Sequence, residues 1–531
     1  MTTARGTVVR AGRTVAGFGE HRAAVPVVFG VGLVVYALVS LGLPLQVGRD
    51  LPRYLLAYEQ LFDAHVVFPT ALLQRTPGTP LVVGTLLEAG PFAAELAFAI
   101  LYALSIAAWF CVARRFGPLA AVATGVALLA YPGYVLLFHE LASDALFAAV
   151  FALVALLVVR VVEVTSLARS VALGVGIVGL VLTRPVGQVL VLLGLVPLVA
   201  ARGRRARLAA VAGFAAAVVL PLAALSAHNA LRADDFAIVR GGSASLLFRT
   251  FVADRIVGPE NGPASEELAR AVSRELLANE PYRSRGIDLE TFFSSGSSRM
   301  NDDFIVLADR TWGWDDDYGH LARAAREAVR AHPATYARGV SRDVWRLLLW
   351  PVYAPVEEKA EQAAQRTRSA RVEASTAPPT PTGDDLIPSS REAPYISTPD
   401  GRIREVWTSP DDHGFVFRDA ADRTGAAALD RQVAGLLDGL PDRAQRPALV
   451  RLVNDLSRLY PRPFMWLLVG LVAAVWRRPR GIAVPVVLAG AALLVLVSTS
   501  LAVYAVAEYA VPVVPAFVLL ATTGSLGKRS G

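Results

Sequence analysis

The sequence predicts an all-α polytopic membrane protein. Of its 531 residues, 54% are hydrophobic and 18% are charged, whereas a soluble chain carries about 25% charged residues. Long apolar runs fill 24–228 and 462–523, and the sequence between them has an ordinary soluble composition. Arginines gather between the apolar runs, as they do in the cytoplasmic loops of membrane proteins.

The apolar runs predict ten membrane crossings. A helix needs about 20 apolar residues to cross the hydrocarbon layer, or fewer when it is kinked. The first run is longer than a signal-peptide core and lacks a clear cleavage site, so we interpret it as a retained span. The crossings are expected at 24–44, 91–112, 118–138, 143–162, 170–183, 186–201, 208–227, 463–476, 482–499 and 503–522.

The arginines predict the orientation of these crossings. The net charge is +7, from 52 basic and 45 acidic residues. With a cytoplasmic N-terminus (1–23) and tail (523–531), every arginine cluster falls on the cytoplasmic side. A nucleic-acid-binding protein would instead gather its charge on one soluble face, so that class is excluded. The use of arginine rather than lysine, with the Ala/Val/Leu-rich runs, indicates a GC-rich bacterial genome, so the expected location is a bacterial plasma membrane. The clusters lie at 114–115, 160–169, 202–207, 477–480 and 528–529.

The long loops divide the chain into regions. The transmembrane core, 24–227, contains a first outer loop at 45–90, and transmembrane helices return at 463–522. Helical periodicity predicts a helical extracytoplasmic region at 228–356, where the stretch 320–349 ends in Trp and Leu residues and is expected to lie on the membrane. The stretch 357–400 is rich in Pro, Ser and Thr and reads as a flexible linker, followed by an extracytoplasmic segment at 401–462.

Signatures of soluble enzymes are missing. The sequence has no P-loop, HExxH or Gly-x-Ser-x-Gly motif, and its seven histidines lack metal-ligand spacing. Its single cysteine, Cys111, excludes a disulfide framework. The sequence identifies no cofactor with certainty, and no metal ligand is assigned. The acidic run Asp315-Asp316-Asp317 leaves open a divalent cation, Mg²⁺ or Mn²⁺, although a solvated loop is the commoner role of such a run.

Ionisable residues at the outer membrane surface are the candidates for function. Arg49 and Asp50 directly follow the first span, with Tyr54 shortly after. Asp50 also suits the N-cap of a helix with Pro52 in its first turn. Its position alone favours neither the functional role nor the capping role. Asp144 is a candidate cap for the fourth span, whereas Glu140 has no capping role.

Two further outer residues lie near the membrane boundary. Arg184 departs from the positive-inside trend, which indicates either a side chain that reaches the interface or one that binds a phosphate. Tyr509 follows Glu508 in the last outer turn.

Several of these short motifs together resemble those of C-type glycosyltransferases (the GT-C superfamily). The branch they resemble includes protein O-mannosyltransferases and aminoarabinose transferases. The resemblance spans most of 24–350 and 463–522. The motifs, in the order of the superfamily, are Gly48-Arg49-Asp50, Thr76-Pro77-Gly78-Thr79-Pro80, Ser143-Asp144-x-Leu-Phe, Thr183-Arg184-Pro185, Ala328 to Pro333, and Glu508-Tyr509-x-x-Pro-x-x-Pro.

The resemblance implies a GT-C-like bundle that transfers a sugar from a polyprenyl-phosphate donor to an envelope acceptor, with inversion, on the extracytoplasmic side. Asp50 would be the general base. The resemblance implies substrate binding by Arg49, Tyr54, Glu140 and Asp144, and binding of the lipid phosphate by Arg184 and Tyr509.

One departure and one rival reading stay open. Relatives commonly carry Arg directly before the last Tyr, where this chain has Glu508. That departure motivates a degenerate transferase that only binds the lipid. The rival class is a non-catalytic transporter or scaffold of envelope assembly, although transporters often show repeated halves that this sequence lacks.

Overall fold

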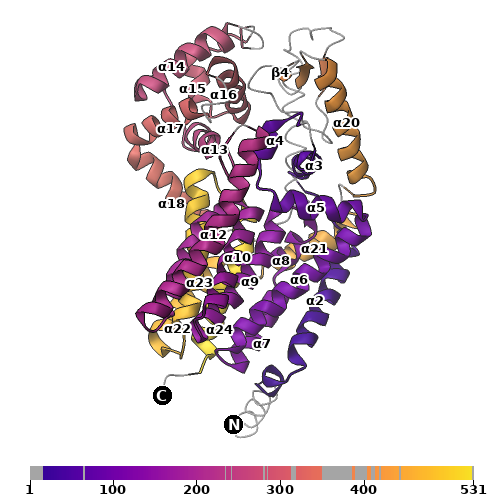
Figure 1. Ribbon diagram of the computed structural model, residues 1–531, viewed down its shortest axis with the longest axis vertical. Helices are drawn as coiled ribbons and strands as arrows, with labels where there is room; N and C mark the ends of the chain where they lie inside the picture. The colour runs from indigo at the N-terminus through magenta and orange to yellow at the C-terminus, as the bar shows by residue number, and fades with distance from the viewer. Residues whose placement is uncertain are drawn as a thin grey trace.

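A computed structural model gives the fold of most of the chain (Figure 1). The described part is mainly helical, and five of its helices are long and apolar enough to cross a membrane. This agrees with the prediction of a helical membrane protein. Arg49, Asp315 to Asp317 and most of the expected linker lie outside the described residues. These are 16–48, 50–63, 66–233, 235–240, 242–278, 282–283, 285–312, 318–349, 386–388, 403–407, 413–417, 420–441 and 444–528.

Each of the ten expected crossings coincides with an apolar helical segment of the structure. Five match the long helices, which are α6 (Pro91–Arg114), α9 (Ser143–Glu163), α12 (Arg204–Ala233), α23 (Ala483–Ala502) and the stretch Ala507–Leu526, built of η6 (Ala507–Tyr509), η7 (Val511–Val513) and α24 (Val514–Leu526). The others match shorter helices, which are α2 (Ala24–Ser40), α7 (Pro118–Leu129), α10 (Leu167–Thr183), η1 (Pro185–Gly194) with α11 (Leu195–Ala200), and α22 (Pro463–Arg477).

The stretch after Pro185 shows how a short segment reaches the thickness of a bilayer. Residues Pro185–Gly194 form a 3₁₀ helix and Leu195–Ala200 an α-helix. At about 2.0 Å per residue for the first and about 1.5 Å for the second, the pair spans roughly 29 Å, close to the ~30 Å hydrocarbon layer.

Basic segments from distant parts of the chain meet at one end of the bundle. Arg115 forms a 3.0 Å ion pair with Glu163. The backbone N–H of Arg480 donates to the Lys528 carbonyl at 2.9 Å, and that of Lys528 donates to Phe116 at 3.0 Å. In Figure 1 this is the lower end, where α2 begins and α24 ends. The geometry agrees with placing these clusters on one side of a membrane.

The first outer loop is folded at the opposite end. It contains α3 (Leu51–Gln60), α4 (Pro69–Gln74) and α5 (Gly78–Glu88), and α3 and α4 each carry a proline in the first turn, where it costs no hydrogen bond. Strand β1 (Gln46–Val47) pairs in parallel with β2 (Glu140–Leu141), which follows α8 (Pro132–Leu137). This pairing ties the first outer loop to the second outer turn.

Gly48 permits the close approach of these two strands. A Cβ atom at this position would lie 2.1 Å from the Leu141 carbonyl oxygen, an overlap that only a backbone shift relieves. We expect Gly48→Ala to lower the free energy of unfolding by about 1–3 kcal/mol, as overpacked sites do. Thermal unfolding of the purified protein in detergent measures the change.

Gly30 provides the matched control, because a Cβ atom there meets nothing within 4 Å. Gly30→Ala, in the interior of α2, should keep or slightly raise the stability. Equal stability of Gly48→Ala and the wild type would show that β1 and β2 are not closely packed.

The described part of 228–349 is helical, as expected. Phe251, Phe292, Phe293 and Phe304 gather in its own hydrophobic core. Its helices are α13 (Gly242–Phe248), the π-helix η2 (Arg249–Ala253), η3 (Pro259–Asn261), α14 (Pro263–Ala271), the π-helix η4 (Val272–Leu277), α15 (Leu289–Ser294), α16 (Ser298–Thr311), α17 (Gly319–Ala331) and α18 (Pro333–Leu349).

The end of α18 departs from the expected membrane-lying segment. Leu347 and Leu348 are buried in the main hydrophobic core. The Trp345 ring, which is half-exposed, packs edge-on against Phe464 of α22. Protein contacts therefore cover apolar residues that the sequence pattern assigned to lipid.

A buried arginine joins this outer region to α23. Arg249 is fully buried, and its Nη1 donates to Asp343 at 2.8 Å and to the Val503 carbonyl at 2.8 Å. Its Nε lies 3.1 Å from the Asp254 carboxylate. The Tyr336 hydroxyl donates to the Leu501 carbonyl at 2.8 Å. These bonds satisfy carbonyls left unpaired at the C-terminal end of α23.

The region before the last crossings mixes strands and helices. Strands β3 (Leu386–Pro388), β5 (His413–Phe417) and β4 (Ile403–Trp407) form an antiparallel sheet in that spatial order. Strand β3 falls within the segment expected as a linker. Helices α20 (Ala420–Leu437) and α21 (Pro447–Ser457) follow and lead to α22.

Candidate functional site

Most of the candidate residues line one pocket at the end of the bundle opposite the basic clusters. Its volume is about 320 Å³, at the lower end of the range of ~300–1,000 Å³ typical of ligand pockets. Asp50, Tyr54, Glu140, Asp144, Arg184 and Tyr509 all line it, and they come from segments far apart in the sequence. Arg49 lies outside the described residues.

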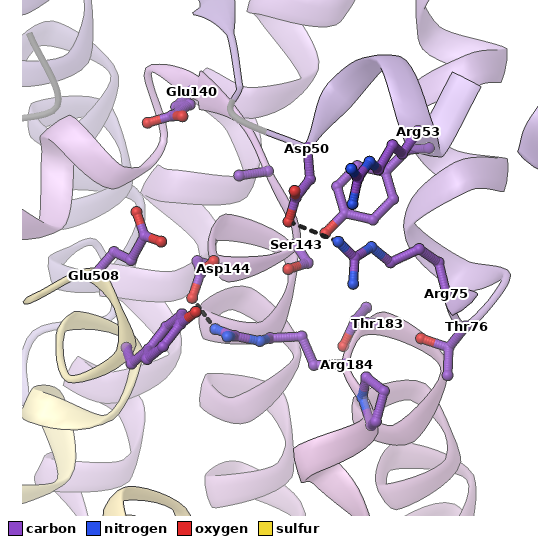
Figure 2. Close-up of a pocket in the computed structure, with 14 residues that line it drawn as sticks. Asp50, Arg53, Arg75, Thr76, Glu140, Ser143, Asp144, Thr183, Arg184 and Glu508 are labelled. Carbon is purple, nitrogen blue, oxygen red and sulfur yellow. Dashed lines mark hydrogen bonds and ion pairs between the residues drawn. The ribbon is translucent and has the colours of Figure 1, made fainter. Parts of the chain in front are cut away.

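Asp50 is oriented by an arginine that the sequence analysis did not select. It stands directly before α3, but its side chain does not cap that helix within the described residues. Its carboxylate forms a 3.2 Å ion pair with Arg75, and both side chains are partly exposed (40% for Asp50 and 31% for Arg75). Asp50 thus occupies the N-cap position while its carboxylate faces the pocket (Figure 2).

Tyr54 lies one turn along α3 and forms part of the wall. The Arg75 guanidinium lies 5.8 Å from the centre of its ring. Burial raises the pKa of the Tyr54 hydroxyl above its ordinary value, an effect that Arg75 opposes. The tyrosine therefore stays neutral at physiological pH.

Arg184 owes its position to the proline that follows it. A residue before proline is disfavoured in helical conformation, and Arg184 is extended (φ −150°, ψ 135°) where α10 ends. Its guanidinium forms an ion pair with Asp144 in the first turn of α9. Each charge complements the dipole of its own helix end. The pair is mostly buried, so Arg184 is held inside the pocket.

Tyr509 also contacts this arginine. It belongs to the 3₁₀ turn η6, and its ring centre lies 4.8 Å from the Arg184 guanidinium carbon. Cation–π contacts of this kind contribute about 0.5–2 kcal/mol. An ion pair and an aromatic ring together thus fix the direction of the guanidinium.

The lining of the pocket carries charges of both signs, and Asp50 and Asp144 are paired with Arg75 and Arg184. Figure 2 shows Glu140 and Glu508 on one side of the pocket, and Arg53 and Arg75 on the other. Glu140 is buried and comes from β2, and Glu508 comes from η6. With Asp50 and Asp144, the lining carries four carboxylates and three guanidinium groups. Such a site suits a polar ligand that carries a phosphate and several hydroxyl groups.

No cluster of three or more His, Cys, Asp or Glu residues suited to a metal ion occurs in the described part of the chain. The acidic run Asp315 to Asp317, on which the expectation of a divalent cation rested, lies outside it. The cation stays an expectation from the sequence.

Two charged lining residues, Arg53 and Arg75, were not selected in the sequence analysis. Arg75 directly precedes the Pro-rich turn of the first outer loop, which is short enough for the positive-inside trend to apply. The same departure from the positive-inside trend singled out Arg184, and it was the available signal for Arg75.

The sequence matches no protein-family model, no curated protein and no solved structure. Fold and site together define a mainly helical membrane protein with a charged pocket at one end of its bundle.

Proposed function

We propose that the protein is a C-type integral membrane glycosyltransferase. It transfers a sugar from a polyprenyl-phosphate donor to a glycan, lipid or protein acceptor of the bacterial cell envelope, on the extracytoplasmic face. The observation that carries this proposal is the shared pocket, in which a partly exposed carboxylate, Asp50, and a fixed guanidinium, Arg184, lie at the end of the bundle away from the basic clusters.

The donor is assigned to the Arg184 side of the pocket. The planar guanidinium fork matches phosphate oxygens, and it is held in advance by Asp144 and Tyr509. A group already aimed at the developing charge stabilises a transition state without having to reorganise. As the bond between the anomeric carbon and the phosphate oxygen breaks, its electron pair passes to the phosphate beside Arg184.

The acceptor is assigned to the Asp50 side. Asp50 takes the proton of an acceptor hydroxyl while that oxygen attacks the anomeric carbon from the face opposite the phosphate, which inverts the configuration. The ion pair with Arg75 orients the carboxylate, and its 40% exposure leaves room for the acceptor to approach. Glu140 and Glu508 offer acceptors to sugar hydroxyl groups.

The test is sugar transfer by the purified chain reconstituted in lipid vesicles. The vesicles receive labelled polyprenyl-phosphate mannose or arabinose together with an envelope fraction as acceptor, and we expect label to move into that fraction. Failure with every lipid-linked donor would favour the transporter or scaffold reading. Photo-crosslinking to a polyprenyl phosphate without turnover would favour a degenerate transferase that only binds the lipid, as the Glu508 departure suggests.

Arg184 gives a prediction about the donor phosphate. We expect Arg184→Gln to lower the rate of transfer by about 100- to 1,000-fold, the usual cost of losing one donor to a developing negative charge. Since the guanidinium acts mainly as the phosphate leaves, kcat should fall by a larger factor than KM rises. Initial rates over a range of donor concentrations separate the two effects.

Arg115→Gln is the matched control. Arg115 forms an ion pair with Glu163 at the other end of the bundle, where both side chains are well exposed. This variant should keep its activity. A purely larger KM in Arg184→Gln, at unchanged kcat, would contradict a role in the chemical step.

A further inference from the structure

Helix α21, which joins the outer region to α22, has three distinct faces. Its core face carries Val450, Asn454 and Ser457, all buried. The core face packs against α8, and Val450 shares a small apolar cluster with Leu43 and Leu136. The backbone N–H of Arg446 also donates to the Gly42 carbonyl at 3.0 Å. The helix is therefore fixed to the protein along one side.

The second face is apolar and exposed. Leu449, Leu452 and Leu456 recur at the spacing of one helix face, and they are between 39% and 55% exposed. Leu459, just beyond the end of the helix, is 80% exposed. Because the core face already anchors the helix, these leucines are not needed to hold it in place. An exposed row of leucines marks a surface that covers a further apolar partner.

The third face carries charges. Arg451, Asp455 and Arg458 are exposed, and Arg458 forms a 3.5 Å ion pair with Asp455. At 100° per residue, this face points about 125° away from the leucine row and about 100° away from the core face. A helix with apolar and charged sides at such an angle is suited to the boundary between lipid and water.

The leucine row continues a surface that already faces outward along the bundle. Val27, Val31, Val34, Leu38 and Leu41 form a stripe along α2 and are 41–60% exposed. The stripe ends beside α21, where a Cβ atom on Gly42 would lie 2.9 Å from that of Leu449. The exposed apolar side chains of α2 and α21 thus meet at Gly42 and Leu449.

We propose that α21 lies in the outer leaflet of the bilayer, parallel to the membrane plane. Its leucine row enters the boundary between headgroups and acyl chains, and its charged face points to water. The partner is the lipid surface itself, and the inference does not depend on the proposed transfer reaction.

The segment before α21 also meets the first outer loop. The Val47 N–H donates to the Pro441 carbonyl at 3.4 Å, and Val47 lies three residues before Asp50.

Site-directed spin labels test this placement. Cys111 is the only cysteine, so Cys111→Ser gives a background in which Leu452→Cys, Leu456→Cys, Arg451→Cys and Asp455→Cys are each labelled in the full chain, reconstituted in lipid nanodiscs. Val34→Cys on α2 serves as the reference for lipid contact. The readout is the ratio of collision rates with oxygen, which enters lipid, and with a water-soluble nickel chelate.

We expect the labels at 452 and 456 to have a ratio several-fold above those at 451 and 455, corresponding to a depth of about 5–10 Å. Equal ratios at all four positions would place the whole helix in water and overturn the proposal. Labels at 452 and 456 shielded from both reagents, with dipolar broadening between chains, would assign the leucine row to a second copy of the protein and overturn it as well.

Discussion

Replacing Asp50 by Asn should reduce sugar transfer by about 100- to 10,000-fold, the usual contribution of a general base. The amide keeps the shape of the side chain but cannot accept the acceptor's proton. Because the Asp50–Arg75 pair is partly exposed, its loss should change stability by no more than about 1 kcal/mol. Transfer rate and thermal unfolding, measured on the same preparation, separate loss of chemistry from loss of fold.

Asp455→Asn is the matched control for this variant. Asp455 is an exposed acid on α21, outside the pocket lining, and is paired with Arg458. The same change of carboxylate to amide should leave transfer unaffected there. Full activity of Asp50→Asn would refute the assigned base, and inactivity with a large loss of stability would refute the claim that the residue acts in chemistry alone.

Arg249→Met should give the largest loss of stability, about 3–5 kcal/mol, since it leaves buried carboxylates without their cation. Asp254 and Asp343 both pair with this guanidinium, and all three side chains are almost completely buried. Burial already raises the pKa of Asp254 above its ordinary value, although Arg249 opposes the shift. Thermal unfolding in detergent measures the loss.

Two further variants keep this prediction testable if Arg249→Met fails to fold. Asp343→Asn preserves the shape of the site and the Arg249–Asp254 pair, so it should lose less stability. Arg274→Met removes an exposed arginine paired with Glu275 and should cost about 0–1 kcal/mol. Equal stability of all three variants would mean that the buried network does not hold the outer region to α23.

The apolar pattern predicted where helical segments lie along the chain, but not whether each is an α-helix or a 3₁₀ helix. Hydropathy depends on composition along the chain, so it predicted a span at 186–201 without any sign that Pro185–Gly194 forms a 3₁₀ helix. The end of α18 shows a different limit. Its Trp and Leu residues have the composition of a membrane-lying segment, yet Leu347 and Leu348 pack inside the protein. A local sequence pattern does not show whether an element distant in the sequence will bury its apolar residues.

The candidate site was predictable as a set of residue types, not as a geometry. Asp50 and Arg184 stood out because ionisable groups at a membrane boundary are costly and seldom kept without a role. Arg75 was not predicted from the sequence, because its pairing with Asp50 depends on the path of α3 and α4. Asp144 was expected to cap a helix, whereas the structure pairs it with Arg184, 40 residues away.

The dispersed origin of the pocket has a consequence for biosynthesis. Its walls come from α3, β2, the start of α9, the end of α10 and η6. Spans are made in chain order, so Asp50, Asp144 and Arg184 enter the membrane before the outer region is translated. Glu508 and Tyr509 arrive only after that region and α23 have been made. Contacts between such distant segments form late in folding. A chain stalled before η6 would therefore be inserted and largely helical, yet it would lack one wall of the pocket.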